Sequence, residues 1–248
     1  MIRSVKNINF SLIERSNFYN KYQIEIKNYW EYFFWKNPTT FDGNILSVIQ
    51  IEDDDCNFNV TIELLKFSYI VYAQRYGKFK TRSLFSSGYI LTSDNFIGLV
   101  LDQRNRIDLA GGMASLEDFL DGEYKPEMCL FREVKEEIGL DLSLDNFKVT
   151  LKYFKYPDKK EDGEAHFPVG LIYEIKTNYK MKDIRKMYDV AKRDGEIKDI
   201  ILKGEYEPIN DISQEANDLI ERMLKLDPKE RITIEEILKH PWLKHVDI

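Results

Sequence analysis

The chain has 248 residues, of which 43% are hydrophobic and 13% aromatic. This apolar content can build a substantial core and excludes a wholly disordered chain, while the length fits one large domain or a domain with appendages. The formal net charge of −7 argues against a protein that coats nucleic acid through phosphate contacts.

The two cysteines, Cys56 and Cys129, are too few for a disulfide framework, and the three histidines are too scattered for a zinc site. The first residues contain no apolar signal region. No stretch approaches the roughly 18 uncharged apolar residues that a membrane span needs. We therefore expect a soluble, cytoplasmic protein in a reducing compartment.

Residues 1–82 are expected to form an N-terminal extension. A dense aromatic block at 29–35 predicts a helix that ends at an Asn-Pro turn. Alternating apolar residues at 45–51 and 58–64 predict two strands. The acidic run between them predicts a solvated hairpin turn.

The segment from residue 83 is rich in predicted strands and contains one strong helix at 127–138. Pro126 suits the start of this helix and Gly139 suits its end. Two further helices are expected in the tail, at 214–226 and 234–238. The predicted strands of this part of the chain lie at residues 84–91, 96–101, 107–110, 147–156, 169–175 and 200–202.

Three glutamates stand out on the strong helix. Glu133, Glu136 and Glu137 lie at positions i, i+3 and i+4, so their carboxylates project from one face. Carboxylates crowded within one turn repel each other unless a cation lies between them. Mg²⁺ prefers such oxygen ligands and binds beside substrate phosphates. An exposed acidic helix face is the structural alternative.

The residues around these glutamates match a known motif. Residues 132–140, REVKEEIGL, agree at every specified position with the second half of the box G-x5-E-x7-R-E-U-x-E-E-x-G-U, in which U is apolar. Gly111 and Gly112 follow a predicted strand and supply the opening of the box. The chain therefore resembles a Nudix hydrolase, which implies an α+β fold, a sandwich of helices around a mixed sheet. The implied enzyme acts on phosphorus-containing anhydrides.

The resemblance also implies roles for individual residues. Arg132 would orient the loop before the helix, and the Gly111–Gly112 pair would let a phosphate approach closely. A divalent cation, Mg²⁺ or Mn²⁺, would be held on a diphosphate by Glu133, Glu136 and Glu137.

A carboxylate would then remove a proton from the attacking water. The candidates for this base are Glu137, Glu196 and Glu164. For the last two, a solvated loop acid is the plainer interpretation. His166 is expected to be a surface or substrate-contact residue.

Two departures from the motif concern the loop before the helix. Arg132 follows Gly112 by twenty positions where the box has fourteen, which indicates an insertion around residues 114–121. Glu123 precedes Arg132 by nine positions rather than eight, and Tyr124 holds the expected position. We expect a one-residue bulge that lets Glu123 reach the site as a further metal ligand.

A more diffuse resemblance concerns the substrate. Trp30, an Asn-Pro pair and Phe41-Asp42-Gly43 precede the predicted hairpin in an order similar to that of UDP-sugar pyrophosphatase-like Nudix proteins with an N-terminal extension. This resemblance favours a nucleotide sugar; the plainer alternative is that these aromatics close a core. Viral decapping Nudix enzymes are comparable in size, but the acidic balance and the lack of a basic stretch speak against capped RNA.

The tail resembles a different class of protein. From Asp211 to His240-Pro241-Trp242-Leu243, its residues are similar in order and spacing to the last helices of a protein-kinase C-lobe. The catalytic motifs of a kinase are absent from the sequence, so phosphoryl transfer to protein is not expected. Asp227, Arg231, His240 and Trp242 are interpreted as packing and capping residues. The tail would dock on the core or bind a protein partner through its apolar face.

These patterns lead to one prediction and two alternatives. The prediction is a metal-dependent Nudix hydrolase that cleaves the diphosphate of a small nucleoside diphosphate derivative, without nucleic acid or membrane as partner. Its parts are an N-terminal extension at 1–82, a Nudix domain at 83–207 and a helical tail at 208–248. The alternatives are a catalytically weak Nudix module that binds a nucleotide or a protein, and an mRNA-decapping enzyme.

Overall fold

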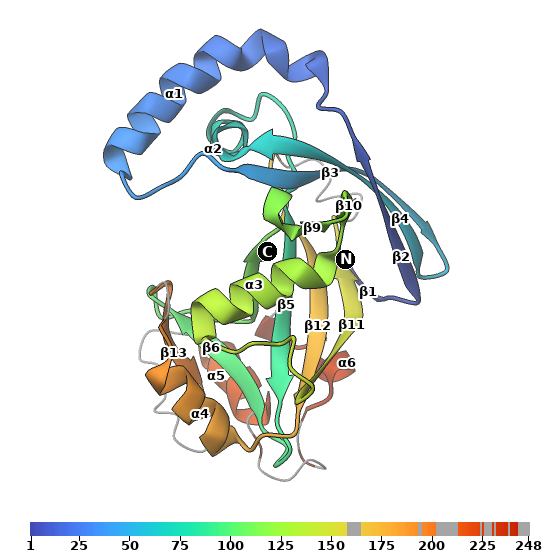
Figure 1. The fold of residues 1–248 in the computed structure, drawn as a ribbon, viewed down its shortest axis with the longest axis vertical. Coiled ribbons are helices and arrows are strands. Elements are labelled where there is room, and N and C mark those ends of the chain that lie inside the picture. The colour runs from blue at the N-terminus through green and yellow to red at the C-terminus, as the bar shows by residue number, and fades with distance from the viewer. Residues whose placement is uncertain are drawn as a thin grey trace. The chain divides into compact units, whose positions relative to one another are not determined.

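Figure 1 shows the helices and strands of the computed structural model. The chain divides into two compact units. The first comprises residues 1–88, 111–133 and 150–173, and the second comprises 89–110, 134–149 and 174–248. The boundaries predicted after residues 82 and 207 stay a prediction. The structure describes residues 1–157, 165–192, 195–201, 213–223, 225, 230, 232–237 and 239–242.

A three-stranded sheet forms much of the first unit. Strand β4 (Asn57–Lys66) lies in the middle, pairs in parallel with β2 (Asn7–Ile13) and pairs antiparallel with β3 (Asn44–Asp54). The predicted hairpin is therefore confirmed. Its turn residues Asp55 and Cys56 both have positive φ, 47° and 67°, as tight hairpin turns require. With parallel and antiparallel pairs side by side, this sheet is mixed.

Three helices of the first unit pack around an aromatic cluster. They are the 3-10 helix η1 (Asn17–Tyr22), α1 (Gln23–Lys36) and α2 (Phe67–Tyr76). The helix predicted from the aromatic block is α1, and it ends before the Asn-Pro turn as expected. Among its own residues, however, α1 buries only Ile26, and Trp35 is 76% exposed. The cluster consists of Tyr19, Tyr69, Tyr72 and Phe79 with Ile26, Leu65 and Ala73, and Tyr29 of α1 packs against it.

The largest sheet has eight strands, and its main path runs β1-β11-β12-β5-β6-β13, with β7 beside β6 and β8 beside β5. Within the first unit β1 pairs antiparallel with β11, and within the second β6 pairs antiparallel with both β13 and β7. Each strand predicted between residues 84 and 202 has a counterpart here. The bounds are β1 Ile2–Ser4, β5 Leu84–Leu91, β6 Ile97–Asp102, β7 Ile107–Asp108, β8 Ala110–Met113, β11 Phe147–Lys155, β12 Val169–Thr177 and β13 Ile197–Ile201.

The strong helix is α3 (Pro126–Ile138), one residue longer than predicted. The second unit adds α4 (Met181–Val190), which the sequence patterns did not indicate. In the tail, α5 (Gln214–Met223) and α6 (Ile234–Ile237) lie within the predicted helices. The expected α+β class is confirmed.

The tail is folded onto itself. His240 is 5% exposed, and its Nδ1 accepts a hydrogen bond of 3.3 Å from the Trp242 N–H. The other ring nitrogen, Nε2, therefore carries the proton and donates to Asp218 of α5 over 3.0 Å. His240 is a packing residue, as interpreted from the sequence; Asp227 and Arg231 lie outside the described residues.

Two glycines that end helices provide a test of the fold. Gly77 follows α2 with φ of +60°, and Gly139 follows α3 with φ of +76°. Among the described residues, a Cβ at Gly77 would meet nothing within 4 Å, whereas a Cβ at Gly139 would overlap the side chain of Ala191.

We expect Gly77→Ala to lower the free energy of unfolding by about 1 kcal/mol, the cost of left-handed backbone. Gly139→Ala should lower it by about 2 kcal/mol or more, because the overlap adds to the same backbone cost. Urea unfolding followed by circular dichroism measures both losses. Equal losses would contradict the close approach of Gly139 to Ala191.

Candidate functional site

Helix α3 carries the three glutamates of the motif. Its apolar side chains Leu130, Val134 and Ile138 are fully buried, which anchors the helix. The glutamates differ in exposure: Glu136 is exposed, Glu133 is half-buried and Glu137 is only 6% exposed. Three carboxylates within one turn therefore face three different degrees of solvation.

The glycine pair in β8 is required by close contacts. Gly111 has φ of +146°, and a Cβ there would overlap the backbone of Ser86 and Ser87. A Cβ at Gly112 would overlap the carboxylate of Glu133. Gly112 thus makes room for a glutamate of α3. Its predicted contact with substrate stays a prediction.

Arg132 is the centre of the polar network at the start of α3. Its Nε donates to Asp118 Oδ1 over 3.0 Å and its Nη2 to Asp118 Oδ2 over 3.2 Å, a two-pronged ion pair. Its Nη1 donates to Glu133 Oε1 over 2.6 Å, and its Nη2 also donates to the Met113 carbonyl over 3.1 Å. The loop from Met113 to Asp118 and the helix are joined through this one side chain. The predicted loop-orienting role of Arg132 in the reaction stays a prediction.

The electrostatics of Arg132 follow from these contacts. Burial would by itself lower the pKa of the guanidinium, but the hydrogen bond with Asp118 and the charges of Glu133 and Asp118 raise it overall. Arg132 therefore stays a cation and offsets part of the negative charge that Glu133 brings to the helix face.

Asp118 is a site residue that sequence reasoning missed. It is 1% exposed and lies at the end of the short 3-10 helix η2 (Leu116–Asp118). Ser115 caps η2, and the Ser115 N–H donates to Asp118 Oδ2 over 2.7 Å. Five residues separate Gly112 from Asp118, so Asp118 occupies the acidic position of the box when it is counted forward from Gly112. Two signals in the sequence could have identified Asp118. They are this count from Gly112 and the Ser-x-x-Asp capping pattern at 115–118.

The inserted residues therefore follow Asp118. They form a small hairpin of β9 (Phe119–Leu120) and β10 (Glu123–Tyr124). Its turn residues Asp121 and Gly122 have φ of 53° and 80°. Glu123 lies on this hairpin with an exposed carboxylate, which forms an ion pair of 2.6 Å with Lys125. Its predicted role as a metal ligand stays a prediction.

The remaining residues that the sequence singled out are Glu196, Glu164 and His166. Glu196 is exposed and directly precedes β13, and Glu164 lies outside the described residues. His166 lies with its ring nitrogens 3.0 Å from Thr81 Oγ1 and 3.4 Å from Ser83 Oγ. His166 is half-buried, and burial lowers the pKa of its ring; its expected role as a surface or substrate-contact residue stays a prediction.

The fit of a metal ion depends on the donor set. Carboxylate oxygens such as those of Glu133, Glu136 and Glu137 are the hard ligands that Mg²⁺ and Mn²⁺ prefer. In the described part of the chain, no three His, Cys, Asp or Glu side chains come together in an arrangement that could hold a metal ion. The donor chemistry fits, while the arrangement of the carboxylates is not that of a closed site.

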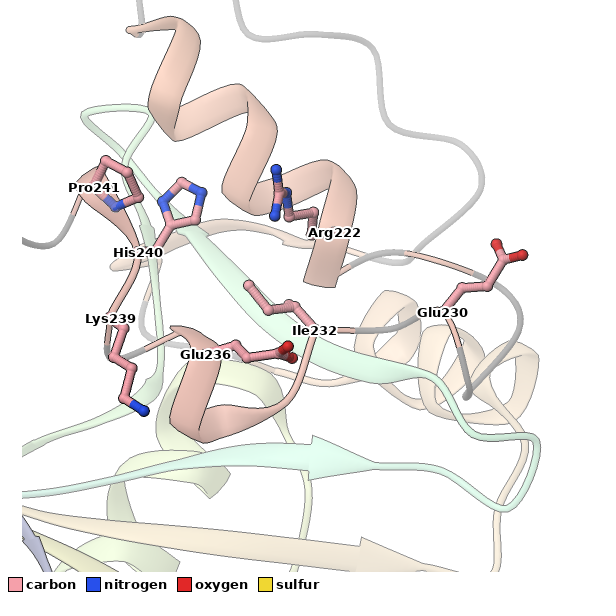
Figure 2. A pocket seen from close by; sticks show the side chains of 7 residues that line it. All are labelled: Arg222, Glu230, Ile232, Glu236, Lys239, His240 and Pro241. Carbon is pink, nitrogen blue, oxygen red and sulfur yellow. The ribbon is translucent and has the colours of Figure 1, made fainter.

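A second candidate site is a hollow of about 430 Å³ in the tail (Figure 2). Two of its charged side chains, Glu236 and Arg222, form hydrogen bonds with other residues of the tail. The Glu236 carboxylate accepts the N–H and hydroxyl of Thr233, which lowers the pKa of Glu236, and Arg222 Nε donates to Asp218 over 3.0 Å. The lining mixes cations with carboxylates and favours neither an anionic nor a cationic ligand. It consists of Arg222, Glu230, Ile232, Glu236, Lys239, His240 and Pro241.

In a comparison with protein families, residues 169–243 match the protein kinase domain. Similar curated proteins include calcium-dependent protein kinase 15 of Oryza sativa subsp. japonica, 47% identical over 58 residues, and the SNF-related serine/threonine-protein kinase of Homo sapiens, 46% identical over 54 residues. These matches cover 22% of this chain, and 11% and 7% of those two kinases. The C-terminal part of the chain is therefore similar to the corresponding part of protein kinases, in agreement with the resemblance of the tail.

Solved structures similar to this chain include a NUDIX-family hydrolase from Clostridium perfringens. It is 18% identical with a TM-score of 0.32, and the likeness covers 58% of this chain and 96% of that one. Another is the NUDIX domain of Shewanella oneidensis NrtR complexed with ADP ribose, 13% identical with a TM-score of 0.31 over 56% and 82% of the two chains.

No helix in the described ranges is both long enough and apolar enough to cross a membrane.

Removal of the Asp118 carboxylate tests the network. We expect Asp118→Ala to lower the free energy of unfolding by about 3–5 kcal/mol, because Arg132 would lose its buried partner. Glu117→Ala, which removes the exposed acid next to it, should change stability by less than about 0.5 kcal/mol. Thermal unfolding compares the two variants, and a similar small loss in both would show that the Asp118–Arg132 pair does not hold the loop.

Proposed function

We propose that this chain is a divalent-metal-dependent hydrolase of the Nudix type. It cleaves the diphosphate of a nucleoside diphosphate linked to another moiety. The observation that carries the proposal is the set of hydrogen bonds that Arg132 donates. One guanidinium, held by the buried Asp118, donates both to the Met113 carbonyl beside the glycine pair and to Glu133 of α3. The match of residues 132–140 to the Nudix box supports the same function.

The chain's own residues would divide the work. Glu133, Glu136 and Glu137 would hold the cation, which when bound would neutralise diphosphate oxygens and lower the pKa of a water. Arg132 keeps Glu133 against Gly112, the position where the absent side chain leaves room. The exposed Glu136 is accessible to an incoming ion, whereas the buried Glu137 is held in place by the helix.

The general base is proposed to be Glu137, because a base must lie within hydrogen-bond reach of the water that it deprotonates. Glu137 shares one helix face with the other two glutamates by its spacing. Glu196 is the alternative base and would have to act from the exposed segment before β13.

The substrate is proposed to be a nucleotide sugar. Support comes from the order of Trp30, the Asn-Pro pair and Phe41 in the N-terminal extension. Phe41 is highly exposed and so remains available for contact with a ligand. ADP-ribose, named for the Shewanella structure, and capped RNA belong in the same test as competing substrates.

A second candidate function is a module that binds a nucleotide or a protein with little turnover. It is favoured by the carboxylates of the described residues, which do not form a three-ligand group, and by the kinase-like C-terminal part. Such a protein would bind ligand without releasing product.

Neutralisation of Glu136 tests the hydrolase. We expect Glu136→Gln to lower kcat with Mg²⁺ or Mn²⁺ by about 10²- to 10³-fold, because it removes one of the charges proposed to hold the cation. Glu127→Gln, an exposed glutamate in the first turn of the same helix, should keep wild-type turnover. The measurement is nucleoside-monophosphate release from UDP-sugars, ADP-ribose, dinucleoside polyphosphates, nucleoside triphosphates and capped RNA.

The panel separates the candidates. One substrate turned over far above the others, and lost in Glu136→Gln, supports the hydrolase and identifies its substrate class. Equal turnover in Glu136→Gln and wild type contradicts it. Ligand binding without turnover by the wild-type protein favours the binding module.

A further inference from the structure

The loop that precedes α3 contacts the three-stranded sheet β2-β4-β3, called here the N-terminal sheet. The first contact involves the first residues of the loop. The Leu46 N–H of β3 donates to the Ala114 carbonyl over 2.8 Å. Ile45 of the same strand forms an antiparallel bridge with Ser115. Ala114 is fully buried, and Ser115 is the residue that caps η2. The first residues of β3 therefore hold Ser115 in place, and Ser115 is the cap of the short helix η2 that ends at Asp118.

The same loop rests on the N-terminal sheet a second time at its last residues. The ring of Tyr124 in β10 meets the ring of Phe10 in β2 edge to face, with centroids 5.0 Å apart. Tyr124 is 8% exposed and also contacts Phe119 of β9 at 5.7 Å. Because Pro126 begins α3 only two residues later, this aromatic contact lies directly before the helix of the site.

A backbone hydrogen bond links the two points. The Lys125 N–H donates to the Asp118 carbonyl over 3.0 Å, which closes the β9–β10 hairpin onto η2. Asp118 is thus held from both sides, by Ser115 and by Lys125, and its carboxylate holds Arg132. Contacts therefore lead from Phe10 to Tyr124, through the adjacent Lys125 to Asp118, and from Asp118 to Arg132.

We propose that the N-terminal sheet is a positioning element of the active site, and that Phe10 is a positioning residue for Arg132 and Glu133. The inference rests on the proposed function for its catalytic consequence, but its geometric content concerns the chain alone. Phe10 pairs with Val60 through the backbone of β2 and β4. Truncation of its side chain therefore leaves the strand pairing intact and removes the support under Tyr124.

The test compares three variants of the full chain. Phe10→Ala removes the ring, Phe10→Tyr keeps it, and Leu12→Ala shortens an apolar side chain that is 46% exposed two residues along the same strand. The first measurement is the NMR signal of the Arg132 Nε–H, which donates to Asp118, and its rate of hydrogen exchange. The second is Mn²⁺ binding by electron paramagnetic resonance, and the third is kcat and KM on the best substrate.

In Phe10→Ala we expect faster exchange at the Arg132 Nε–H. Mn²⁺ affinity and kcat should be about three- to tenfold lower, as expected for the loss of one aromatic pair, with KM little changed. Phe10→Tyr and Leu12→Ala should keep wild-type values. A folded Phe10→Ala protein with an unchanged Arg132 signal, Mn²⁺ affinity and kcat would overturn the inference.

Two further outcomes are decided by the same experiment. If Phe10→Ala does not fold, Tyr124→Leu, which keeps apolar volume but loses the edge-to-face contact, takes its place with the same expectation. If the wild-type protein turns over no substrate, the proposed function fails, and the Arg132 exchange rate alone supports or overturns the positioning role.

Discussion

The ion pair between Arg132 and Asp118 is the interaction on which the candidate site depends. Asp118 is almost completely buried, and a buried carboxylate is tolerated only when it is paired and hydrogen-bonded. Here both oxygens are used, by the guanidinium and by the Ser115 N–H. Because either charge left alone would be costly, the loop and the helix are held in one relative arrangement. That arrangement sets the surroundings of Glu133 on α3.

The sequence allowed α3 and its glutamates to be predicted because their spacing is local. The strands of the largest sheet were also recognisable, since their apolar residues alternate. Helix α2 was missed because six of its ten side chains are buried, so apolar residues follow one another without helical periodicity. Helix α4 was missed although Met181, Ile184 and Tyr188 bury one face at a helical spacing. That segment contains few apolar residues, and the pattern was not recognised.

The candidate site was only partly predictable for a related reason. A count backward from Arg132 crosses the β9–β10 hairpin and reaches Glu123, while a count forward from Gly112 reaches Asp118. The position of the inserted residues is decided by the left-handed turn at Asp121 and Gly122 and by the packing of Tyr124. The contact of Tyr124 with Phe10 joins residues more than a hundred positions apart, and no local pattern reports such a contact.

The pairing of β1 has a consequence for the order in which the chain can fold during synthesis. Ile2 to Ser4 pair with Tyr153 to Lys155, so this strand has no partner until the ribosome has made β11. At about 5–20 residues per second, roughly 8–30 seconds pass before that partner exists. Strand β2, a few residues later, finds its partner β4 far sooner. The three-stranded sheet can therefore form early in synthesis. Strand β1 stays unpaired for longer, and during that time a competing strand or a chaperone can bind it.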